Sequence, residues 1–557
     1  MPYPRTYPAG RFWLPRAIGR AALVVCLILA PAALAAEIDQ QDLFLSGTAH
    51  NADQQRSSGF KPRGDTEAWP LHLPLDWGAD PYSDRNWRFQ LNAWRMTDPF
   101  ILEYFQTDNQ EPLLEALAFI EDWHAFHAEQ DHGNDFAWYD MAAGIRALRL
   151  AFFLDIIQDG RLQVPSQTVA SLEQLAAEHA RRLQERSFLS TGNHGLFQIF
   201  GLNLLCKVAA ELPVCDGARE FAADFLKDEL MPAQFTPQGV HREHSPDYHS
   251  FTIRAIERLG GTRHIDVPEV REAIDRAVQV TPWLVFPTGE FARIGDSGGR
   301  SAPLEIDPEH PVCLSPGQCY AVGDFTQSGY AIIRSLPSGE QSSMLFAMGM
   351  AFSGAHKHAD DLSFELFEFG RFIFIDSGKY GYERDEMRAY VTSAAAHNTI
   401  SLEDRPIGSR DVVMKGSLLE PIETSEDGFV IRGRLDRPEL FSQERQIDYV
   451  PGETLRISDR VSAPWLRLWP LVYVSSLHLA PDLEPVMRED GFTIDLGANV
   501  VEARLLAAGC TVTATRGQED PPLGWYSVGY LRMEPTTVVR ASCPGRSREI
   551  VWDISFR

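Results

Sequence analysis

The hydrophobic periodicity of this chain changes once along its length. From about residue 85 to residue 280 the apolar residues recur at helical spacing, as Leu113, Leu117 and Ile120 do, which predicts amphipathic helices. After about residue 320 apolar and polar residues alternate, as in Thr454-Leu-Arg-Ile-Ser, which predicts strands. Because the two patterns occupy separate halves, we expect an all-α domain followed by an antiparallel β-sandwich.

The boundary between these halves is predicted from composition. A chain of 557 residues allows three or four domains of about 150 residues, or two large ones. The stretch from Gly295 to Gly317 is rich in Gly, Pro and Ser and separates the two patterns. We therefore predict a helical domain over residues 37–310 and a β-sandwich over residues 311–557, preceded by a leader over residues 1–36.

The leader has the layout of a secretory signal peptide. Four arginines precede an apolar run, Ala21–Ala35, which ends in Ala33-Leu34-Ala35, a typical cleavage site. The alternative is a membrane anchor, but the run contains Pro31 and a span needs about twenty apolar residues. We expect a periplasmic or secreted protein with no membrane span in the mature chain.

The charge of the chain limits the classes of partner. Acidic residues number 77 and basic residues 51, for a formal net charge of −26. No basic tract occurs after residue 20, which argues against nucleic acid and against an anionic membrane surface as partners. Strong acidity mostly indicates a soluble protein, and it does not by itself indicate a polyanionic ligand.

The cysteines agree with export. Beyond the leader they form three near-neighbour pairs, which predict the disulfides 206–215, 313–319 and 510–543 in an oxidising compartment. Six cysteines allow fifteen connectivities, so other pairings stay open. No C-x-x-C motif occurs, which argues against a structural zinc knot.

Two polar clusters precede predicted helices. They are Gly192-Asn193-His194-Gly195 and Glu243-His244-Ser245-Pro246-Asp247-Tyr248-His249. Both have a simple structural explanation as helix N-caps. The second cluster holds more titratable groups than a cap requires, which makes it a candidate for a functional site.

A further group of residues lies beside predicted strands. His356 and His358 are two residues apart in a strand-like segment and therefore point to the same side. Asp376 ends an apolar strand, and His397 precedes the next one. Histidines and a carboxylate from neighbouring strands form a plausible divalent-metal site, and imidazole ligands favour Zn²⁺ over Ca²⁺. The alternative is a set of ordinary histidines on surface loops.

Together these motifs resemble the heparinase II/III-like polysaccharide lyases. The segment from His356 to Thr399 is similar to the family's H-x-H-x-D, D-x-G and H-N-T signature. Asn193-His194 and the S-x-x-Y-H of Ser245–His249 extend the similarity, which is weaker at Trp87–Trp94 and Trp138–Arg146. The resemblance implies an incomplete (α/α) toroid followed by an antiparallel β-sandwich, in agreement with the change of period.

The resemblance also implies a role for each candidate residue. The metal ligands, usually of one structural zinc ion, would be His358, Asp376 and His397. The residues of the catalytic cleft would be Asn193, His194, Tyr248 and His356. Tyr380 and Glu243 are expected to contact the substrate, an anionic polysaccharide.

The chemistry of such a lyase is consistent with these residue types. A 4-O-linked uronate is cleaved by β-elimination, which leaves a 4,5-unsaturated uronate end. Neutral donors such as Asn193 must hold the carboxylate as negative charge develops on it. Tyr248 can act as base and acid in a syn elimination, or His194 as base and Tyr248 as acid in an anti elimination. Because a phenol of pKa about 10 is a poor base, we expect His356, His194 or His249 to lower the pKa of Tyr248.

Other functions stay open at this point. A glycoside hydrolase on an (α/α) toroid needs two carboxylates; Glu243 and Asp247 are candidates, but this function leaves Asn193 and His194 without a role. A non-catalytic polysaccharide-binding or export protein would not require Tyr248.

A metallohydrolase is a third possibility. It would use the predicted metal ligands and would depend on Asp360 or Asp361 to activate a metal-bound water. The polymer is also undetermined, since heparan-type glycosaminoglycan, hyaluronan, alginate and a bacterial exopolysaccharide all contain uronate. The acidity of the chain argues mildly against very highly sulfated polymers, and the sequence does not decide endo or exo action or the oligomeric state.

Overall fold

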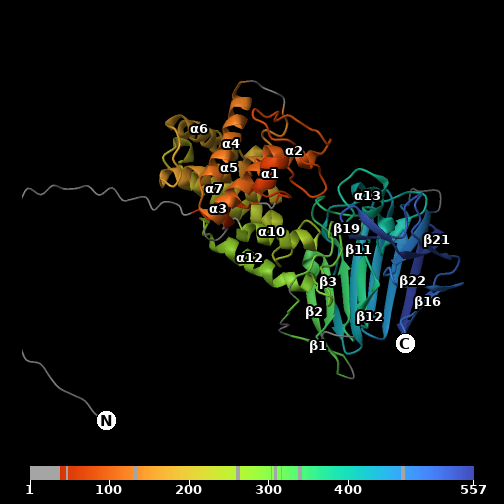
Figure 1. Cartoon of the computed structure of the whole chain (residues 1–557). Coiled ribbons are helices and arrows are strands. Elements are labelled where there is room, and N and C mark those ends of the chain that lie inside the picture. Colours follow the sequence, from red (N-terminus) through yellow and green to blue (C-terminus); the bar gives the residue numbers. More distant parts are fainter. Residues whose placement is uncertain are drawn as a thin grey trace, which may run out of the picture.

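The computed structural model describes residues 38–557, apart from 46–47, 130–133, 259–263, 303, 307–309, 315–316, 337–340 and 466–470. The predicted leader lies outside the described residues. The described chain forms a helical part and, beside it, a part built of β-sheets (Figure 1). No helix among the described residues is long and apolar enough to cross a membrane.

The helical part contains most of the first half of the chain. Its helices are α1 (Ala52–Ser58), α2 (Arg85–Asn92), α3 (Asp98–Thr107), α4 (Glu111–Glu129), α5 (Asp140–Gln158), α6 (Ser166–Leu183), α7 (Asn193–Val208), α8 (Ala218–Phe225), α9 (Met231–Gln234), α10 (Pro246–Arg258) and α12 (Pro268–Val280). Most residues of helices α5 and α7 are buried, on every side of each helix, as expected for helices at the centre of a layered domain.

Helices α5 and α7 pack closely because glycines stand where they meet. A Cβ atom added to Gly144 would lie 2.4 Å from the Phe197 backbone, and one added to Gly201 would lie 2.4 Å from the Gly144 carbonyl oxygen. Larger residues at these positions would push the helices apart. The contact therefore fixes the first residues of both helices, Asp140 and Asn193, relative to each other.

The β part consists of antiparallel sheets. A six-stranded sheet has the order β1 (Val312–Cys313), β2 (Cys319–Phe325), β3 (Tyr330–Ser335), β4 (Met344–Met348), β6 (Phe364–Glu368), β7 (Arg371–Phe374). An eight-stranded sheet has the order β10 (Glu423–Ser425), β11 (Gly428–Arg437), β12 (Phe441–Val450), β13 (Thr454–Ser462), β22 (Ser547–Phe556), β17 (Val500–Leu505), β16 (Gly491–Asp495), β15 (Val486–Arg488).

The remaining strands complete the sandwich. A four-stranded sheet has the order β18 (Thr511–Arg516), β21 (Thr537–Gly545), β14 (Leu471–His478), β8 (Ile400–Leu402), and two small pairs are β5 (Met350–Ala351) with β9 (Gly416–Ser417) and β19 (Trp525–Gly529) with β20 (Arg532–Pro535). The eight- and four-stranded sheets pack on each other: the rings of Phe441 and Tyr473 are 5.7 Å apart, and Trp552 donates to Ser475 Oγ at 3.2 Å. Burial alternates along β12 and β13, as a half-buried strand requires.

The fold class agrees with the prediction: an incomplete (α/α) toroid is followed by an antiparallel β-sandwich. The last described helical turn before the sheets is Thr281–Leu284, and β1 begins at Val312. The segment between them packs against the β part and is more than a linker. The backbone N–H of Arg293 donates to Glu365 at 2.9 Å, and the Arg293 guanidinium donates to the Ser527 carbonyl at 2.7 Å.

The predicted disulfides are confirmed. The structure joins Cys206 to Cys215, Cys313 to Cys319 and Cys510 to Cys543. The first closes the loop after α7, the second links β1 to β2, and the third links the end of the loop before β18 to β21. Each therefore joins elements that are already neighbours in the fold.

Candidate active site

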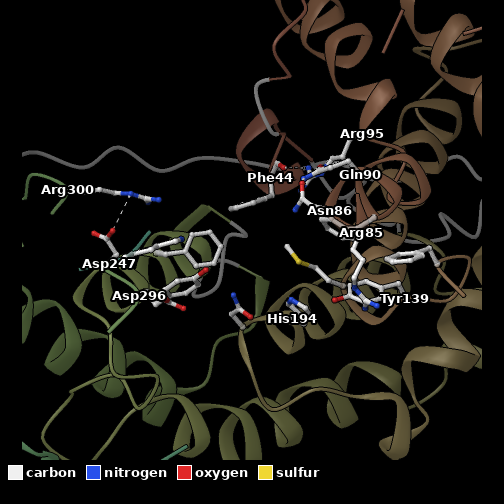
Figure 2. Close-up of a pocket in the computed structure, with 17 residues that line it drawn as sticks. Phe44, Arg85, Asn86, Gln90, Arg95, Tyr139, His194, Asp247, Asp296 and Arg300 are labelled. Atoms are coloured by element: carbon white, nitrogen blue, oxygen red, sulfur yellow. Dashed lines mark hydrogen bonds and ion pairs between the residues drawn. The ribbon is translucent and has the colours of Figure 1, made fainter. Parts of the chain in front are cut away.

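A cavity of about 530 Å³ lies where the helical part meets the β part. Its lining comes from chain segments far apart in sequence: Phe44, Arg85, Asn86, Phe89, Gln90, Arg95, Phe136, Tyr139, Met141, Asn193, His194, Asp247, Tyr248, Phe251, Asp296, Arg300 and Lys379. In Figure 2, His194 and Tyr139 lie on one side of the cavity, and Asp247, Asp296 and Arg300 lie on the other. The predicted residues Asn193, His194 and Tyr248 thus line one cavity.

Asn193 and His194 form the first turn of α7. The His194 ring holds Nδ1 at 3.1 and 3.2 Å from the two carboxylate oxygens of Asp140, the first residue of α5. The ring of Tyr139 packs edge-on against the imidazole at 5.7 Å between centroids. Burial acts to raise the pKa of Asp140, but the hydrogen bond and charge of His194 outweigh burial and lower it. A carboxylate that binds Nδ1 leaves Nε2 of the imidazole as the atom available to a ligand.

Tyr248 lies in the first turn of α10. Its ring stacks on that of His356, with 3.5 Å between centroids and 19° between planes. Its hydroxyl is 2.5 Å from the hydroxyl of Tyr382, and Lys379 Nζ donates to Tyr382 Oη at 2.9 Å. Two phenols and an ammonium group therefore form a chain that runs from Lys379 through Tyr382 to Tyr248.

The pKa of Tyr248 differs from the expectation. Burial raises it to about 12; the hydrogen bond from Tyr382 lowers it, while the charges of Asp296 and Glu243 raise it further. The prediction that neighbouring histidines bring this pKa down was wrong, because burial of the phenol dominates. His249, one of the three named, points elsewhere: its Nε2 is 2.9 Å from the Ala277 carbonyl in the core.

His356 is held by buried carboxylates. Its Nδ1 is 3.0 Å from Asp296 Oδ2, and its Nε2 is 3.4 Å from Glu243 Oε2. Arg388 donates to both oxygens of Asp296, at 2.5 and 3.1 Å, and His358 Nε2 is 3.0 Å from Oδ1. Burial acts to raise the pKa of Asp296, but these hydrogen bonds, first those of the histidines, hold it well below its usual range.

The backbone brings these segments together at Gly295. Its φ is +54°, and a Cβ atom there would lie 2.4 Å from the His244 carbonyl oxygen and 2.8 Å from that of His356. Only glycine accommodates both the conformation and the close approach. The Gly295–Ser297 loop thereby places Asp296 between the helical and the β segments of the site.

The two predicted substrate contacts, Glu243 and Tyr380, are not among the residues that line this cavity. Glu243 is buried, burial raises its pKa, and it contacts His356; it does not line the cavity. Tyr380 packs with Tyr390 and Leu523 and also lies outside the described lining. His356 likewise contacts Tyr248 and is not among the residues that line the cavity.

The predicted metal ligands are buried in the β part. His397 Nδ1 is 2.7 Å from Asp376 Oδ2, and the rings of His358 and His397 are 5.4 Å apart. Within the part of the chain that the structure describes, no group of three or more His, Cys, Asp or Glu side chains is arranged to hold a metal ion. Nevertheless His358 Nδ1 and His397 Nε2 are buried and have no hydrogen-bond partner among the described residues. These two imidazole nitrogens are suitable ligands for a zinc ion, although the side chains of His358, Asp376 and His397 are not arranged around a common metal position in this structure.

Sequence reasoning missed several residues of the site. Asp140 belongs to the segment Trp138–Arg146, whose similarity to the family is weak and predicts no role for this carboxylate. Asp296 lies in the glycine-rich stretch that was interpreted as a domain boundary; a carboxylate flanked by glycines and serine, Gly295-Asp296-Ser297-Gly298, was the available signal. Lys379 and Tyr382 flank the predicted Tyr380 and form the hydrogen-bond chain that reaches Tyr248.

The family models match both halves of this arrangement. Residues 52–297 match the heparinase II/III N-terminus, and residues 319–553 match the heparinase II/III-like C-terminal domain. The chain therefore belongs to the heparinase II/III-like family of polysaccharide lyases. No curated protein matches the chain.

Solved structures share the fold at low sequence identity. A crystal structure of heparinase III has a TM-score of 0.71 and 14% identity, covering 94% of this chain and 86% of that chain. The heparan sulfate lyase HepC from Pedobacter heparinus has a TM-score of 0.64 and 15% identity, covering 90% and 82%. A further heparinase III gene product has a TM-score of 0.65 and 16% identity, covering 93% and 84%. At this identity the likeness shows the common fold.

Proposed function

We propose that this protein cleaves a 4-O-linked uronate in an anionic polysaccharide by β-elimination. A base removes the C5 proton, the C4–O4 bond breaks, O4 receives a proton, and a C4=C5 double bond forms on the uronate. The observation that carries the proposal is that one cavity is lined by both Tyr248 and His194, whose Nδ1 is held by Asp140. Elimination needs these two proton-transfer groups and a binder for the carboxylate.

Asn193 and Lys379 are suited to hold the uronate carboxylate. Both residues line the cavity. Lys379 donates a hydrogen bond to Tyr382 and forms no ion pair with a described carboxylate, and the charges of Asp296 and Asp247 act on it only at longer range. Burial lowers the pKa of Lys379. An amide donor and a cation facing the carboxylate stabilise the negative charge that develops as the C5 proton leaves.

His194 acts as the base in this proposal. Asp140 binds its Nδ1 and fixes the ring, so Nε2 presents its lone pair to the C5 proton. The charge of Asp140 also stabilises the imidazolium that forms once the proton is taken up. This division of roles corresponds to the anti elimination.

Tyr248 acts as the acid. With its pKa near 12 the phenol is protonated at neutral pH, so it can donate a proton to O4 as the C4–O4 bond breaks. Tyr382, which receives a hydrogen bond from Lys379, can pass its own proton to the Tyr248 oxygen in the same step.

The hydrolase alternative is less well supported. It needs two carboxylates that reach the same bond, and Glu243 does not line the cavity. Asp247 accepts from the backbone N–H of Gly298 at 2.8 Å and lies 3.7 Å from Arg300. A hydrolase would also leave the Asp140–His194 pair without a role.

A panel of uronate polysaccharides tests the proposed reaction. Purified protein is incubated with heparan-type glycosaminoglycan, hyaluronan, alginate and bacterial exopolysaccharides, and ultraviolet absorbance of the C4=C5 product is followed. Growth of that absorbance together with new reducing ends supports elimination. New reducing ends without the absorbance would show hydrolysis and refute the proposal.

We also propose one structural zinc ion held by His358 and His397, together with Asp376. The support is the pair of unpartnered buried imidazole nitrogens and the carboxylate that binds the other nitrogen of His397. We expect elemental analysis to find about one zinc per chain, and Asp376→Ala to lose the metal and to melt at a lower temperature, because metal binding to the folded state stabilises it. Metal-free protein with the melting temperature of the wild type would contradict this.

We propose a periplasmic or secreted location, supported by the leader pattern and the three disulfides. The intact mass of protein recovered from the periplasm or medium is expected to correspond to a chain that lacks the leader, residues 1–36, and carries no free thiol. A mass that includes the leader, or alkylation of any of the six cysteines without reduction, would contradict the prediction.

A further inference from the structure

Residues 38–45, which follow the predicted leader, form a short strap on the helical part. They contain the helical turn Gln40–Leu43, whose preceding residue Asp39 accepts a hydrogen bond from a backbone N–H of the turn. Ile38 and Leu43 are 2% and 0% exposed. The first residues of a domain are usually poorly ordered unless other elements tie them down. The burial of this N-terminal strap therefore requires anchors in the helical part.

Two buried arginines bind the backbone of the strap. Arg149 on α5 donates to the Leu43 carbonyl at 2.5 Å, and Arg95 donates to the Phe44 carbonyl at 2.8 Å. Both guanidinium groups also bind the carboxylate of Asp98. Buried charged groups need hydrogen-bond acceptors for their donors, and here the strap provides two. Departure of the strap would remove these acceptors from both arginines in the core.

Side chains of the strap provide further anchors. Asp42 is fully buried, and its Oδ1 is 2.8 Å from Nε2 of His264, which lies after α10. The ring of Phe44 packs edge-on against Phe197 on α7, with 4.7 Å between centroids, and against Phe251 on α10 at 6.5 Å. The strap thus contacts α5, α7 and α10, the helices whose first turns supply residues to the lining of the cavity.

Phe44 has a strained backbone conformation and lines the cavity of the candidate active site. Its φ and ψ are 47° and 48°, in the left-handed region that is unfavourable for a residue with a bulky side chain. Such outliers persist where the surroundings enforce them, and they cluster at functional sites. In Figure 2, Phe44 lies beside Arg95 and across the cavity from His194. The strained turn therefore directs an aromatic side chain into the cavity.

We propose that the strap is a functional part of this cavity and that Phe44 contacts the substrate, its ring packing on the sugar whose C5 proton faces His194. This inference rests on the proposed function, because that function places the uronate beside His194. An aromatic wall binds the C–H face of a sugar ring, while polar groups such as Asn193 fix its orientation. A strap with a structural role alone would support the helices without contributing to substrate affinity, so the two possibilities differ in a measurable way.

Phe44→Ala is expected to raise KM about 10-fold and to change kcat by less than about 3-fold, because a contact made equally in the bound substrate and the transition state affects KM alone. Phe44→Tyr keeps a flat ring and should have a KM close to that of the wild type. Phe105→Ala is the matched control: Phe105, on α3, also packs against the core of the helical part but does not line the cavity, and we expect the wild-type KM. Initial rates are measured on the polymer that the wild-type protein cleaves fastest, as new reducing ends, which count elimination and hydrolysis alike.

Phe44→Gly separates substrate contact from stability. Glycine adopts a φ of 47° without steric strain, so this variant should melt at the same temperature as Phe44→Ala or higher. Its KM should nevertheless rise as much as that of Phe44→Ala, because both variants lack the ring. A KM that instead follows the melting temperature across the Phe44 variants and Phe105→Ala would show a structural role alone and would overturn the proposal.

Hydrogen exchange tests whether the strap is docked. We expect the amides of residues 38–45 in the wild-type protein to exchange slowly, as in buried elements, and to exchange faster in Asp42→Asn, whose KM should rise as well. Exchange at the rate of unstructured chain in the wild-type protein, or a wild-type KM in Phe44→Ala, contradicts the inference and leaves the lyase proposal intact. Reducing ends without unsaturated product, together with the expected changes in KM, refute the lyase proposal and support the role of the strap. A wild-type protein that cleaves no polymer of the panel contradicts both.

Discussion

Tyr248→Phe is expected to lower turnover at least about 100-fold, the scale of general acid–base catalysis. The substitution removes the hydroxyl that would protonate O4 but keeps the ring that stacks on His356 at 3.5 Å. Substrate affinity and melting temperature should therefore change little. Initial rates of unsaturated product, calorimetric binding and thermal unfolding measure the three quantities on one preparation.

Tyr380→Phe is the matched control for this prediction. It removes a phenol hydroxyl two residues from Tyr382 but outside the described lining of the cavity, and we expect wild-type turnover. Tyr382→Phe should have an intermediate effect, because it interrupts the chain of hydrogen bonds from Lys379 without removing the acid. A Tyr248→Phe protein that keeps most of its turnover would move the proton-transfer role to His356, or the whole function to hydrolysis.

His194→Ala is expected to lower turnover about 100-fold or more, because it removes the proposed base. The side chain is about one third exposed, so the fold should tolerate its loss. Free imidazole added to the variant should restore part of the activity, since it can enter the vacated space and take the C5 proton. If the polymer contains both uronate epimers, the loss should be larger for the anti elimination than for the syn elimination.

Asp140→Asn distinguishes a positioning role from a structural one. The amide keeps the size of the carboxylate but cannot stabilise an imidazolium, so we expect turnover to fall about 10-fold or more while KM changes little. His124 is a remote histidine that contacts Ser171, and His124→Ala serves as the control.

Two results would contradict the role of His194 as base: wild-type turnover in His194→Ala, or no rescue of that variant by imidazole.

Local patterns were enough to predict the fold class and the disulfides. Helical spacing such as that of Leu113, Leu117 and Ile120, and alternation such as that around Thr454, depend on which side of an element faces the core. The cysteine pairs are close in sequence, so each joins neighbouring elements. The motifs around Asn193, Tyr248 and His356 also identified segments that converge in the structure.

The function of the stretch after Gly295 could not be predicted from such patterns. Composition marks it as irregular, but its importance comes from hydrogen bonds between Asp296 and residues about 60 and 92 positions away, His356 and Arg388. Likewise Tyr380 and Tyr382 are indistinguishable in sequence, since both are tyrosines in one loop. Only the packing of that loop decides which of them reaches Tyr248.

The sequence by itself therefore determined the two-part architecture, the disulfides and the chemical types at the site, because these follow from short-range periodicity and motif. The tertiary structure decided which side chains meet: Asp140 with His194, Tyr382 and Lys379 with Tyr248, and Glu243 beside His356 outside the cavity. It also reversed the expected direction of the Tyr248 pKa, which burial raises. Partner choice and burial are set by contacts between segments that are distant along the chain, and a pattern read over a few residues carries no information about them.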